Sequence, residues 1–260
     1  MSHEAEIPGR MLSMEEWQMI CFRYYTIGQF VQEKQILEVG CGAGLGLGYL
    51  SKRAKRTIGG DLSADNIRCA QRHYGNRAEL LLMDAHKLPF KDDSFDVMTA
   101  MEVIFYLHFD EFLEECYRVL RKKGILIFCL PNKDREDGFH GSPLSNRYYS
   151  VPELFALLEQ HKFDAEFFGA FPISSGVAWQ KLQSAVILRA RKILDILEIM
   201  PKGREFRGFL NKIILNKTLV LKEELEDEDM KILENVQLEP IPCDSPDFQH
   251  KILYCIAKTK

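Results

Sequence analysis

The sequence lacks long apolar runs, paired cysteines and any marked excess of one charge. No segment approaches the roughly 18 apolar residues that a membrane-spanning helix requires. None of the seven cysteines belongs to a C-x-x-C pair, which indicates reduced, buried thiols rather than a disulfide framework or a metal site. The formal net charge of −4 gives no general argument for a nucleic-acid partner. The first ten residues contain no apolar core, so we expect no signal peptide and a cytoplasmic protein.

What the sequence does contain is an alternation of short apolar runs with helical stretches. The apolar runs that predict strands cover residues 35–40, 56–62, 79–84, 94–101 and 124–131. Two further runs, at 163–172 and 250–258, predict additional strands. Strands that are apolar almost throughout and are separated by helices are typical of a parallel sheet covered on both faces. The pattern therefore predicts an α/β fold.

We divide the chain into four segments on this basis. They are an N-terminal helical cap at residues 1–34, a core at 35–172, a helical insertion at 173–249 and a final strand at 250–260. Within the insertion, apolar residues recur at helical spacing from Trp179 to Met200. Residues 175–222 contain ten Lys or Arg against three Asp or Glu, and the acidic segment EELEDED follows. Three roles stay open for it: a lid or dimer element, peripheral contact with an anionic membrane, and contact with RNA.

After residue 131 the alternation stops. Residues 132–149 are polar, contain glycine and proline and show no periodicity, so they predict a long loop. Loops of this length in compact domains are usually functional or mobile. A helix should follow it, because Ser150 is a favourable N-cap and Pro152 suits the first helical turn.

A glycine-rich turn follows the first predicted strand. Glycine occupies every second position from Gly40 to Gly48, which costs stability unless the backbone needs it there. The dinucleotide fingerprint G-x-G-x-x-G fails from every start in this turn, and no Gly-Lys-Ser/Thr follows, so a phosphate-binding loop is excluded as well. Glu38 adds a physical objection, because its carboxylate would repel a pyrophosphate but suits a ligand with an ammonium or sulfonium charge.

The segment LEVGCGAG, with its acidic residue two positions before the first glycine, resembles motif I of the class I S-adenosylmethionine-dependent methyltransferases. The resemblance continues in order through IGGDLS, LLMDAHKLPFKDDSFDVM and RVLRKKGILIFCLP, and it covers about residues 35–172 and the last strand. It implies a doubly wound, seven-stranded, mostly parallel Rossmann-like sheet, with a helical insertion before an antiparallel last strand. It also implies S-adenosylmethionine as the cofactor.

The same resemblance implies which residues contact the cofactor. They are Tyr24, Glu38, Gly40, Cys41, Gly42, Gly44, Asp61, Leu62, Asp84, Ala85 and Met101. Asp61 would hold the ribose hydroxyls, Asp84 would meet the adenine amino group, and Ala85 would present its backbone N–H to the ring. The glycines at 40, 42 and 44 would let the chain pass under the methionine part and the ribose, where a Cβ would collide. Cys41 is expected to fill space in the turn rather than to act as a nucleophile.

Catalytic residues are less clearly marked. Methyl transfer to an oxygen or nitrogen requires alignment and removal of a proton, and histidine suits the second task by its pKa. The candidate bases are His108, which follows the fourth strand, and His140, which lies in the long loop with Arg147, Tyr148 and Tyr149. His86, in the third-strand loop, is a weaker candidate. Each histidine also fits an ordinary loop or capping role.

The class of acceptor can be narrowed. The fourth strand ends in AMEVIFYL, without the Asn/Asp-Pro-Pro-Tyr/Phe of the methylases that act on amino groups of adenine or glutamine. No acidic cluster has the spacing of a metal site, so no metal is expected. The resemblance therefore favours transfer to an oxygen or nitrogen of a small-molecule, lipid-linked or glycan-linked acceptor, with nucleic acid disfavoured. The alternatives are a non-catalytic S-adenosylmethionine-binding regulatory module, an RNA methyltransferase that uses the basic insertion, and an aminopropyltransferase-like enzyme.

Overall fold

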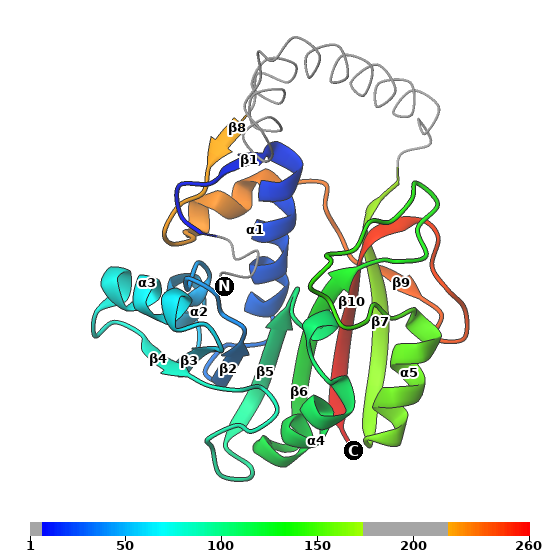
Figure 1. Ribbon diagram of the computed structural model, residues 1–260, viewed down its shortest axis with the longest axis horizontal. Helices are drawn as coiled ribbons and strands as arrows, with labels where there is room; N and C mark the ends of the chain where they lie inside the picture. Colours follow the sequence, from blue (N-terminus) through cyan, green and yellow to red (C-terminus); the bar gives the residue numbers. More distant parts are fainter. Residues whose placement is uncertain (1–6, 174–217) are drawn as a thin grey trace.

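One large mixed sheet forms the centre of the protein, as seen in the computed structural model, which describes residues 7–173 and 218–260 (Figure 1). The strands run in the order β4-β3-β2-β5-β6-β10-β7-β9. Their bounds are β2 (Gln35–Val39), β3 (Arg56–Asp61), β4 (Glu79–Leu82), β5 (Phe95–Met101), β6 (Leu120–Pro131), β7 (Phe163–Pro172), β9 (Glu239–Ile241) and β10 (His250–Thr259). The chain starts inside the sheet at β2, runs to one edge and then returns to build the other side, as in a doubly wound sheet.

The strand pairings confirm the predicted fold class and the direction of the last strand. β2 pairs in parallel with β3 and β5, and the pairs β3–β4 and β5–β6 are also parallel. β10 pairs antiparallel with both β6 and β7. One strand is added to the seven predicted, because β9 pairs antiparallel with the outer side of β7. It is short and contains Pro240, which a sheet tolerates at an edge.

Helices cover both faces of this sheet. They are α1 (Met14–Gly28), α2 (Leu47–Ser51), α3 (Ala64–Tyr74), α4 (Phe109–Val119) and α5 (Val151–Gln160), with the 3₁₀ helices η1 (Ile104–Tyr106) and η2 (Asp227–Leu233). The start predicted at Ser150 is confirmed: its side chain and that of Glu153 form a capping box at α5. α1 begins with a capping box of the same kind between Ser13 and Glu16.

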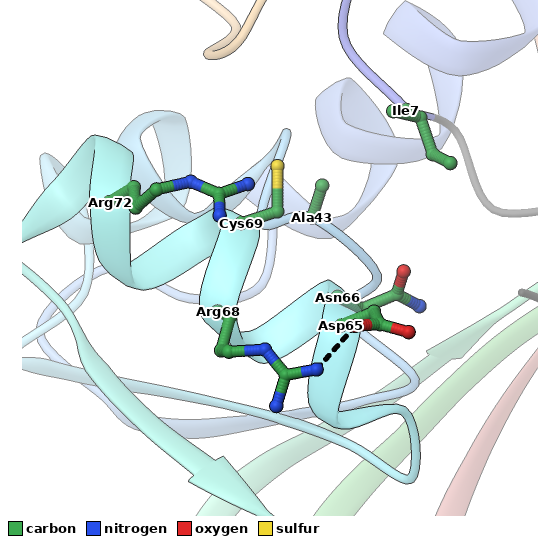
Figure 2. A pocket seen from close by; sticks show the side chains of 7 residues that line it. All are labelled: Ile7, Ala43, Asp65, Asn66, Arg68, Cys69 and Arg72. Carbon is green, nitrogen blue, oxygen red and sulfur yellow. Dashed lines mark hydrogen bonds and ion pairs between the residues drawn. The ribbon is translucent and has the colours of Figure 1, made fainter.

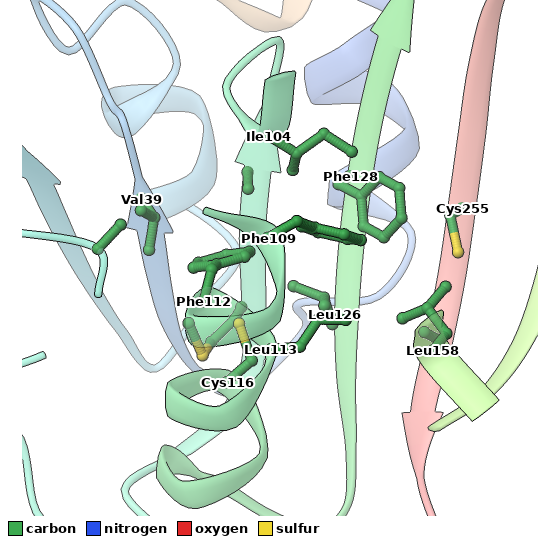
Figure 3. Close-up of a cluster of buried hydrophobic side chains, with 14 of the residues drawn as sticks. Val39, Ile104, Phe109, Phe112, Leu113, Cys116, Leu126, Phe128, Leu158 and Cys255 are labelled. Atoms are coloured by element: carbon green, nitrogen blue, oxygen red, sulfur yellow. The ribbon is translucent and has the colours of Figure 1, made fainter. Parts of the chain in front are cut away.

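The two larger buried clusters of the described residues lie on opposite faces of the sheet and hold the layers together. On one face, Phe109, Phe112 and Leu113 of α4 pack with Phe128 of β6 (Figure 3). On the other face, Ile127 of the same strand belongs to a cluster that includes residues of α1 and α2. Because successive residues of a strand point to opposite faces, an apolar run such as β6 is buried on both sides.

The structure differs from the sequence-based expectation over residues 218–249, which the helical pattern assigned to an insertion. β8 (Thr218–Val220) pairs antiparallel with β1 (Met11–Ser13) in a separate two-stranded sheet. Leu221, Leu225 and Leu233 are buried in the cluster that contains α1, and the Leu225 N–H donates to the Leu45 carbonyl at 2.9 Å. These residues pack with the core because their apolar side chains cover α1 and the glycine turn. Residues 174–217 lie outside the described residues, so the lid, dimer, membrane and RNA roles stay predictions.

The thiols follow the expectation from the sequence. All seven cysteines are free, and five of them are buried. Within residues 7–173 and 218–260, no helix is both long and apolar enough to cross a membrane.

Candidate active site

A large open cavity lies at the carboxyl ends of β2, β3, β5 and β6, where doubly wound sheets bind their ligands. Its volume is about 1110 Å³, above the roughly 300–1,000 Å³ of a typical small-molecule site, so it has room for two ligands. We distinguish two parts by the residues that line them. The strand-end half is lined from within residues 23–24, 39–45, 60–66, 83–86 and 101–103, and the loop half from within 105–107 and 131–148.

The cavity brings most of the predicted residues together. The strand-end half is lined by Tyr24, Gly40, Cys41, Gly42, Asp61, Leu62, Asp84, Ala85 and Met101, and the loop half by His140. Three predicted residues do not line it. Glu38 is 1% exposed and lies beneath the turn, and Gly44 packs against Tyr74 and Ala70 of α3. His108 is the N-cap residue of α4.

Gly42 is the glycine whose missing side chain leaves space in the cavity. Its φ is +57°, a left-handed conformation that residues with a side chain rarely adopt, and a Cβ built there meets no atom within 4 Å. At Gly40 a Cβ would lie 2.4 Å from Cγ2 of Val103, and at Gly44 it would lie 3.0 Å from the ring of Tyr74. The expectation that these glycines make room for a cofactor therefore fits Gly42, whereas the other two make room for neighbouring side chains.

Asp61 connects the end of β3 to the glycine turn. Its Oδ2 accepts from the Gly42 N–H at 2.9 Å, and its Oδ1 accepts from the Ser63 N–H at 2.8 Å and from Asn66 Nδ2 at 3.2 Å. A carboxylate offers about four lone-pair positions, so Oδ2 can accept one further hydrogen bond without displacing a protein donor. The side chain can thus receive one hydroxyl from a ligand while it also fixes the turn.

Asp84 is held by His86 in a single orientation. Its Oδ1 accepts from the His86 N–H at 2.9 Å and from ring Nδ1 at 2.8 Å. Nε2 of the same ring accepts the His108 N–H at 3.0 Å, which assigns the proton to Nδ1. The hydrogen bond from the His86 N–H, followed by that from its ring, holds the pKa of Asp84 below its ordinary value although burial opposes it. Asp84 is therefore ionised at neutral pH, and no described residue donates to its Oδ2.

Helix α1 borders the strand-end half with Arg23 and Tyr24. The Tyr24 hydroxyl donates to Glu38 Oε1 at 2.8 Å, and Arg23 lies 3.5 Å from Glu102 Oε1. Glu102 has a φ of +57°, a conformation that costs roughly 1–3 kcal/mol in a residue with a side chain. Such strain at the end of β5 marks a position where the fold fixes a side chain beside the cavity. Carboxylates and a guanidinium at one end suit an amino-acid group, which carries both charges.

The thiol of Cys41 is not activated. Burial raises the pKa of this thiol well above its ordinary value, and the carboxylates of Glu38 and Asp61 raise it further. The thiol therefore stays protonated at neutral pH and fills space in the turn.

Large aromatic side chains form the wall of the loop half. The rings of Phe105 and Tyr148 are stacked with centroids 4.7 Å apart, and Phe139 meets Tyr148 edge-on at 4.6 Å. Tyr106 adjoins Phe105 at 4.5 Å. These contacts join η1, which directly follows β5, to a loop that follows β6. The result is an apolar surface beside the strand-end half.

Hydrogen bonds tie this loop to η1 as well. The Asn146 N–H donates to the Phe105 carbonyl at 2.8 Å, and Asn146 Nδ2 donates to the Tyr106 carbonyl at 2.8 Å. The Ser142 N–H donates to the Tyr148 hydroxyl at 3.0 Å. The loop therefore has defined anchor points although it contains no helix or strand.

Glu153, in the first turn of α5, joins both ends of the same loop. Its carboxylate accepts from Lys133 Nζ and from Arg147 Nη2, each at 2.6 Å. Burial raises the pKa of Glu153, but hydrogen bonds from Lys133, the Ser150 N–H and Arg147 outweigh this effect and lower it to about 2. Arg147 is thus part of a helix-start network rather than of the cavity wall.

Of the candidate bases, His86 and His140 line the cavity, and His108 does not. His86 is held by its hydrogen bond to Asp84, whereas no hydrogen bond or ion pair ties His140 to another described residue. Sequence reasoning missed Phe105, Tyr106, Arg135 and Phe139, which line the loop half. The first two had a usable signal, because they directly follow a predicted strand end. Arg135 and Phe139 had none, since an aperiodic loop does not indicate which of its side chains turn inward.

A second, smaller hollow lies beside α3, where Ala43 of the glycine turn and Ile7 also border it (Figure 2). It measures about 210 Å³, below the roughly 300 Å³ at which small-molecule sites begin. Arg68, on its wall, is paired with Asp65. Ala43, Asp65 and Asn66 border both hollows, so this one is a side recess of the cavity rim.

Comparisons with known proteins agree with this geometry. A family model described as "Methyltransferase domain" matches residues 37–128. The chain is 41% identical over 102 residues to a fatty-acid O-methyltransferase from Mycolicibacterium smegmatis. The aligned region covers 38% of this chain and 37% of that relative. It is 40% identical over 99 residues to phthiotriol/phenolphthiotriol dimycocerosates methyltransferase 1 from Mycobacterium ulcerans, covering 36% of each chain.

The aligned part spans little more than a third of the length of these relatives. Among solved structures, a SAM-dependent methyltransferase from Thermotoga maritima superposes with a TM-score of 0.55 at 18% identity. The superposition covers 95% of this chain and 94% of that one. At this identity the likeness shows a shared fold.

Proposed function

The chain belongs to the class I S-adenosylmethionine-dependent methyltransferases, and we propose that it methylates an oxygen or nitrogen of a lipid-type acceptor. The observation that carries the proposal is a single cavity with two dissimilar halves. One half offers backbone turns and carboxylates to a polar cofactor. The other half offers aromatic surface to an apolar acceptor.

The residues of the strand-end half fit S-adenosylmethionine, the cofactor of this family. The decisive point is the open space over Gly42, which a Cβ would occupy. Asp61 Oδ2 would accept a hydrogen bond from a ribose hydroxyl, and the ionised Asp84 would accept one from the adenine amino group. When bound, the cofactor supplies a methyl group on a sulfonium sulfur, which needs no further activation. The remaining work of the protein is to orient the two ligands and to exclude water.

The loop half supports an acceptor with substantial apolar surface. Burial of such surface contributes roughly 25 cal/mol per Å², so a chain lying along the rings of Phe105, Phe139 and Tyr148 would supply much of the binding energy. Both relatives named above are methyltransferases of lipids by their names, fatty acids in one case and phthiotriol dimycocerosates in the other. An acceptor of this class would place its polar end towards the strand-end half.

The direct test is methyl transfer with defined lipids. The purified chain would be incubated with methyl-labelled S-adenosylmethionine and separate fatty acids, fatty alcohols and long-chain amines, and labelled lipid would be extracted and identified. A thermal shift with S-adenosylhomocysteine would report cofactor binding independently. Binding of S-adenosylhomocysteine without label in any lipid would refute the proposal and favour the regulatory-module alternative.

We also propose that the protein works in the cytoplasm and meets its acceptor at a membrane surface. Seven free cysteines support a reducing compartment. Leu62 and Leu144 line the cavity and are 70% and 51% exposed, which would let them enter the apolar part of a bilayer. Flotation with anionic liposomes tests this, because replacement of both leucines by serine should abolish co-flotation. Wild-type protein that stays unbound would contradict the membrane part.

A further inference from the structure

The protein orients the guanidinium of Arg135 but uses only part of its N–H donors. Its Nε donates to the Gly138 carbonyl at 2.9 Å and lies 3.1 Å from Asp137 Oδ1. The group sits 5.8 Å from the ring centroid of Phe139, which contributes a further cation–π contact. Within the described residues, the guanidinium is ion-paired with Asp137 through Nε, and neither Nη1 nor Nη2 donates a hydrogen bond. Since Arg135 lines the cavity, this outer fork is available to a ligand.

The other arginines around the cavity are engaged differently. Arg10 uses Nη2 to bind Glu16 at 3.1 Å, and Arg23 directs Nη2 at Glu102 at 3.5 Å. Arg147, in the same loop as Arg135, gives Nη2 to Glu153 at 2.6 Å and does not line the cavity. Arg135 therefore differs from these arginines in two ways: neither of its outer nitrogens donates a hydrogen bond to a described residue, and it lies beside the aromatic wall residue Phe139.

The guanidinium of arginine is a planar fork of N–H donors, and it matches the two oxygens of a carboxylate better than any other side chain does. Beside it lies the ring of Phe139, which contacts Tyr148 edge-on, and Tyr148 stacks on Phe105, so that these rings extend an apolar surface from the guanidinium. A ligand that satisfies both features has an anionic carboxylate joined to an apolar chain. A long-chain alcohol or amine would satisfy the aromatic wall but leave the guanidinium unused.

We propose that Arg135 binds the carboxylate of an acyl-chain acid, so that the acceptor atom is a carboxylate oxygen and the product is a methyl ester. This inference rests on the proposed function. In the reaction, a lone pair on the carboxylate oxygen forms the new O–C bond. The C–S bond of the cofactor breaks, and its electron pair stays on sulfur, which becomes neutral. No proton is released, because a carboxyl group with a pKa near 4.3 is already ionised at neutral pH.

The test compares two probes, dodecanoate and dodecanol, and three variants of the full chain. Arg135→Gln removes the charge, Arg135→Lys keeps the charge without the fork, and Arg147→Gln is the matched control from the same loop. We expect Arg135→Gln to raise KM for dodecanoate on the order of 10- to 150-fold, the worth of hydrogen bonds to a charged group. Arg135→Lys should recover part of this loss. Arg147→Gln should change KM by less than about threefold, since it does not line the cavity.

Two further readouts separate this inference from the proposed function. Calorimetry would measure dodecanoate binding to protein saturated with S-adenosylhomocysteine, and the same variants should show the same order of losses. Affinity for S-adenosylhomocysteine should stay within about twofold in all of them. Faster methylation of dodecanol than of dodecanoate, or dodecanoate binding that is unchanged in folded Arg135→Gln, would overturn the inference while leaving lipid methylation intact. Tight, Arg135-dependent binding of dodecanoate without any methyl transfer would support the anion site and refute the proposed function.

Discussion

The two halves of the cavity are built from different kinds of structure. The strand-end half consists of turns that leave β2, β3 and β5, and its contacts come from backbone groups and short side chains such as Gly42 and Asp61. The loop half consists of large side chains, among them Phe139 and Tyr148, in a segment without helix or strand. One half is therefore fixed by the sheet, and the other by contacts between a loop and η1.

This difference indicates how the protein divides its tasks. The turn at Gly42 tolerates few substitutions, because its shape depends on a positive φ and on the hydrogen bond from the Gly42 N–H to Asp61. We therefore expect this half to keep one ligand. An aromatic wall held by ring contacts can change residue by residue without altering the sheet. We therefore expect substitutions in the strand-end half to act on cofactor affinity, and substitutions in the loop half to act on the acceptor.

The largest effect should come from Gly42→Val. The new side chain would fill the space above the turn and would strain a φ of +57°, so affinity for S-adenosylhomocysteine should fall by more than about 100-fold. Calorimetry measures this directly. Gly75→Val is the matched control, because Gly75 has a φ of +54° and open space at its Cβ but lies at the end of α3, outside the cavity. If both variants bind the cofactor equally well, Gly42 does not face it.

Asp61→Ala should have the next largest effect. It removes one hydroxyl acceptor and also the bridge to the Gly42 N–H, so affinity should fall by about 1.5–3 kcal/mol, or on the order of 10- to 150-fold. Asp92→Ala serves as the control, since this carboxylate is 73% exposed, is paired with Arg118 and does not line the cavity. An unchanged dissociation constant in a folded Asp61→Ala protein would remove Asp61 from the site.

The same difference explains how much the sequence could predict. Apolar runs such as 124–131 predicted the strands because both faces of a parallel sheet must be apolar. Ordered motifs predicted the strand-end half because its residues directly follow those strands. Two residues show the limit of this prediction even in the strand-end half. Gly40 makes room for Val103, and Glu38 is buried under the turn, although the motif predicted that both contact the cofactor.

The rest depends on contacts between residues far apart in the sequence, which no local pattern records. The stacking of Phe105 on Tyr148 is one such contact. Another is the packing of residues 218–233 against α1. Leu225 is buried there, but its neighbours in the sequence are acidic, so the local pattern does not indicate a core position. The sequence assigned this segment to an insertion because the alternation of strands and helices did not need it, although Leu221, Leu225 and Leu233 are buried against the core.

The pH-dependent effect of Glu153 should be confined to the loop half. Because the pKa of Glu153 is lowered from 4.5 to about 2, its contribution to stability is present above pH 4.5 and is lost as the pH falls towards 2. Glu153→Gln keeps a side chain that can complete the capping box but loses the ion pairs with Lys133 and Arg147. The free energy of unfolding at pH 7 should drop by about 1 kcal/mol, because the carboxylate is one-third exposed.

Chemical denaturation at several pH values measures this loss, and it should shrink between pH 4.5 and 2. KM for the acceptor should rise several-fold, while the dissociation constant of S-adenosylhomocysteine should stay constant. Glu159→Gln, on the exposed side of the same helix, is the control. A change in cofactor affinity in Glu153→Gln would show that the two halves are coupled and would break the division proposed above.

The smallest effect expected in the cavity is that of His140→Ala. His140 lines the loop half and is one of the candidate bases. Removal of a general base costs roughly 10²–10⁴ in rate when the acceptor must lose a proton. A carboxylate has no proton to lose at neutral pH, so kcat with dodecanoate should change by less than about threefold. Steady-state kinetics at saturating S-adenosylmethionine give this number, and a loss of 100-fold or more would mean that the acceptor reacts as a hydroxyl or an amine.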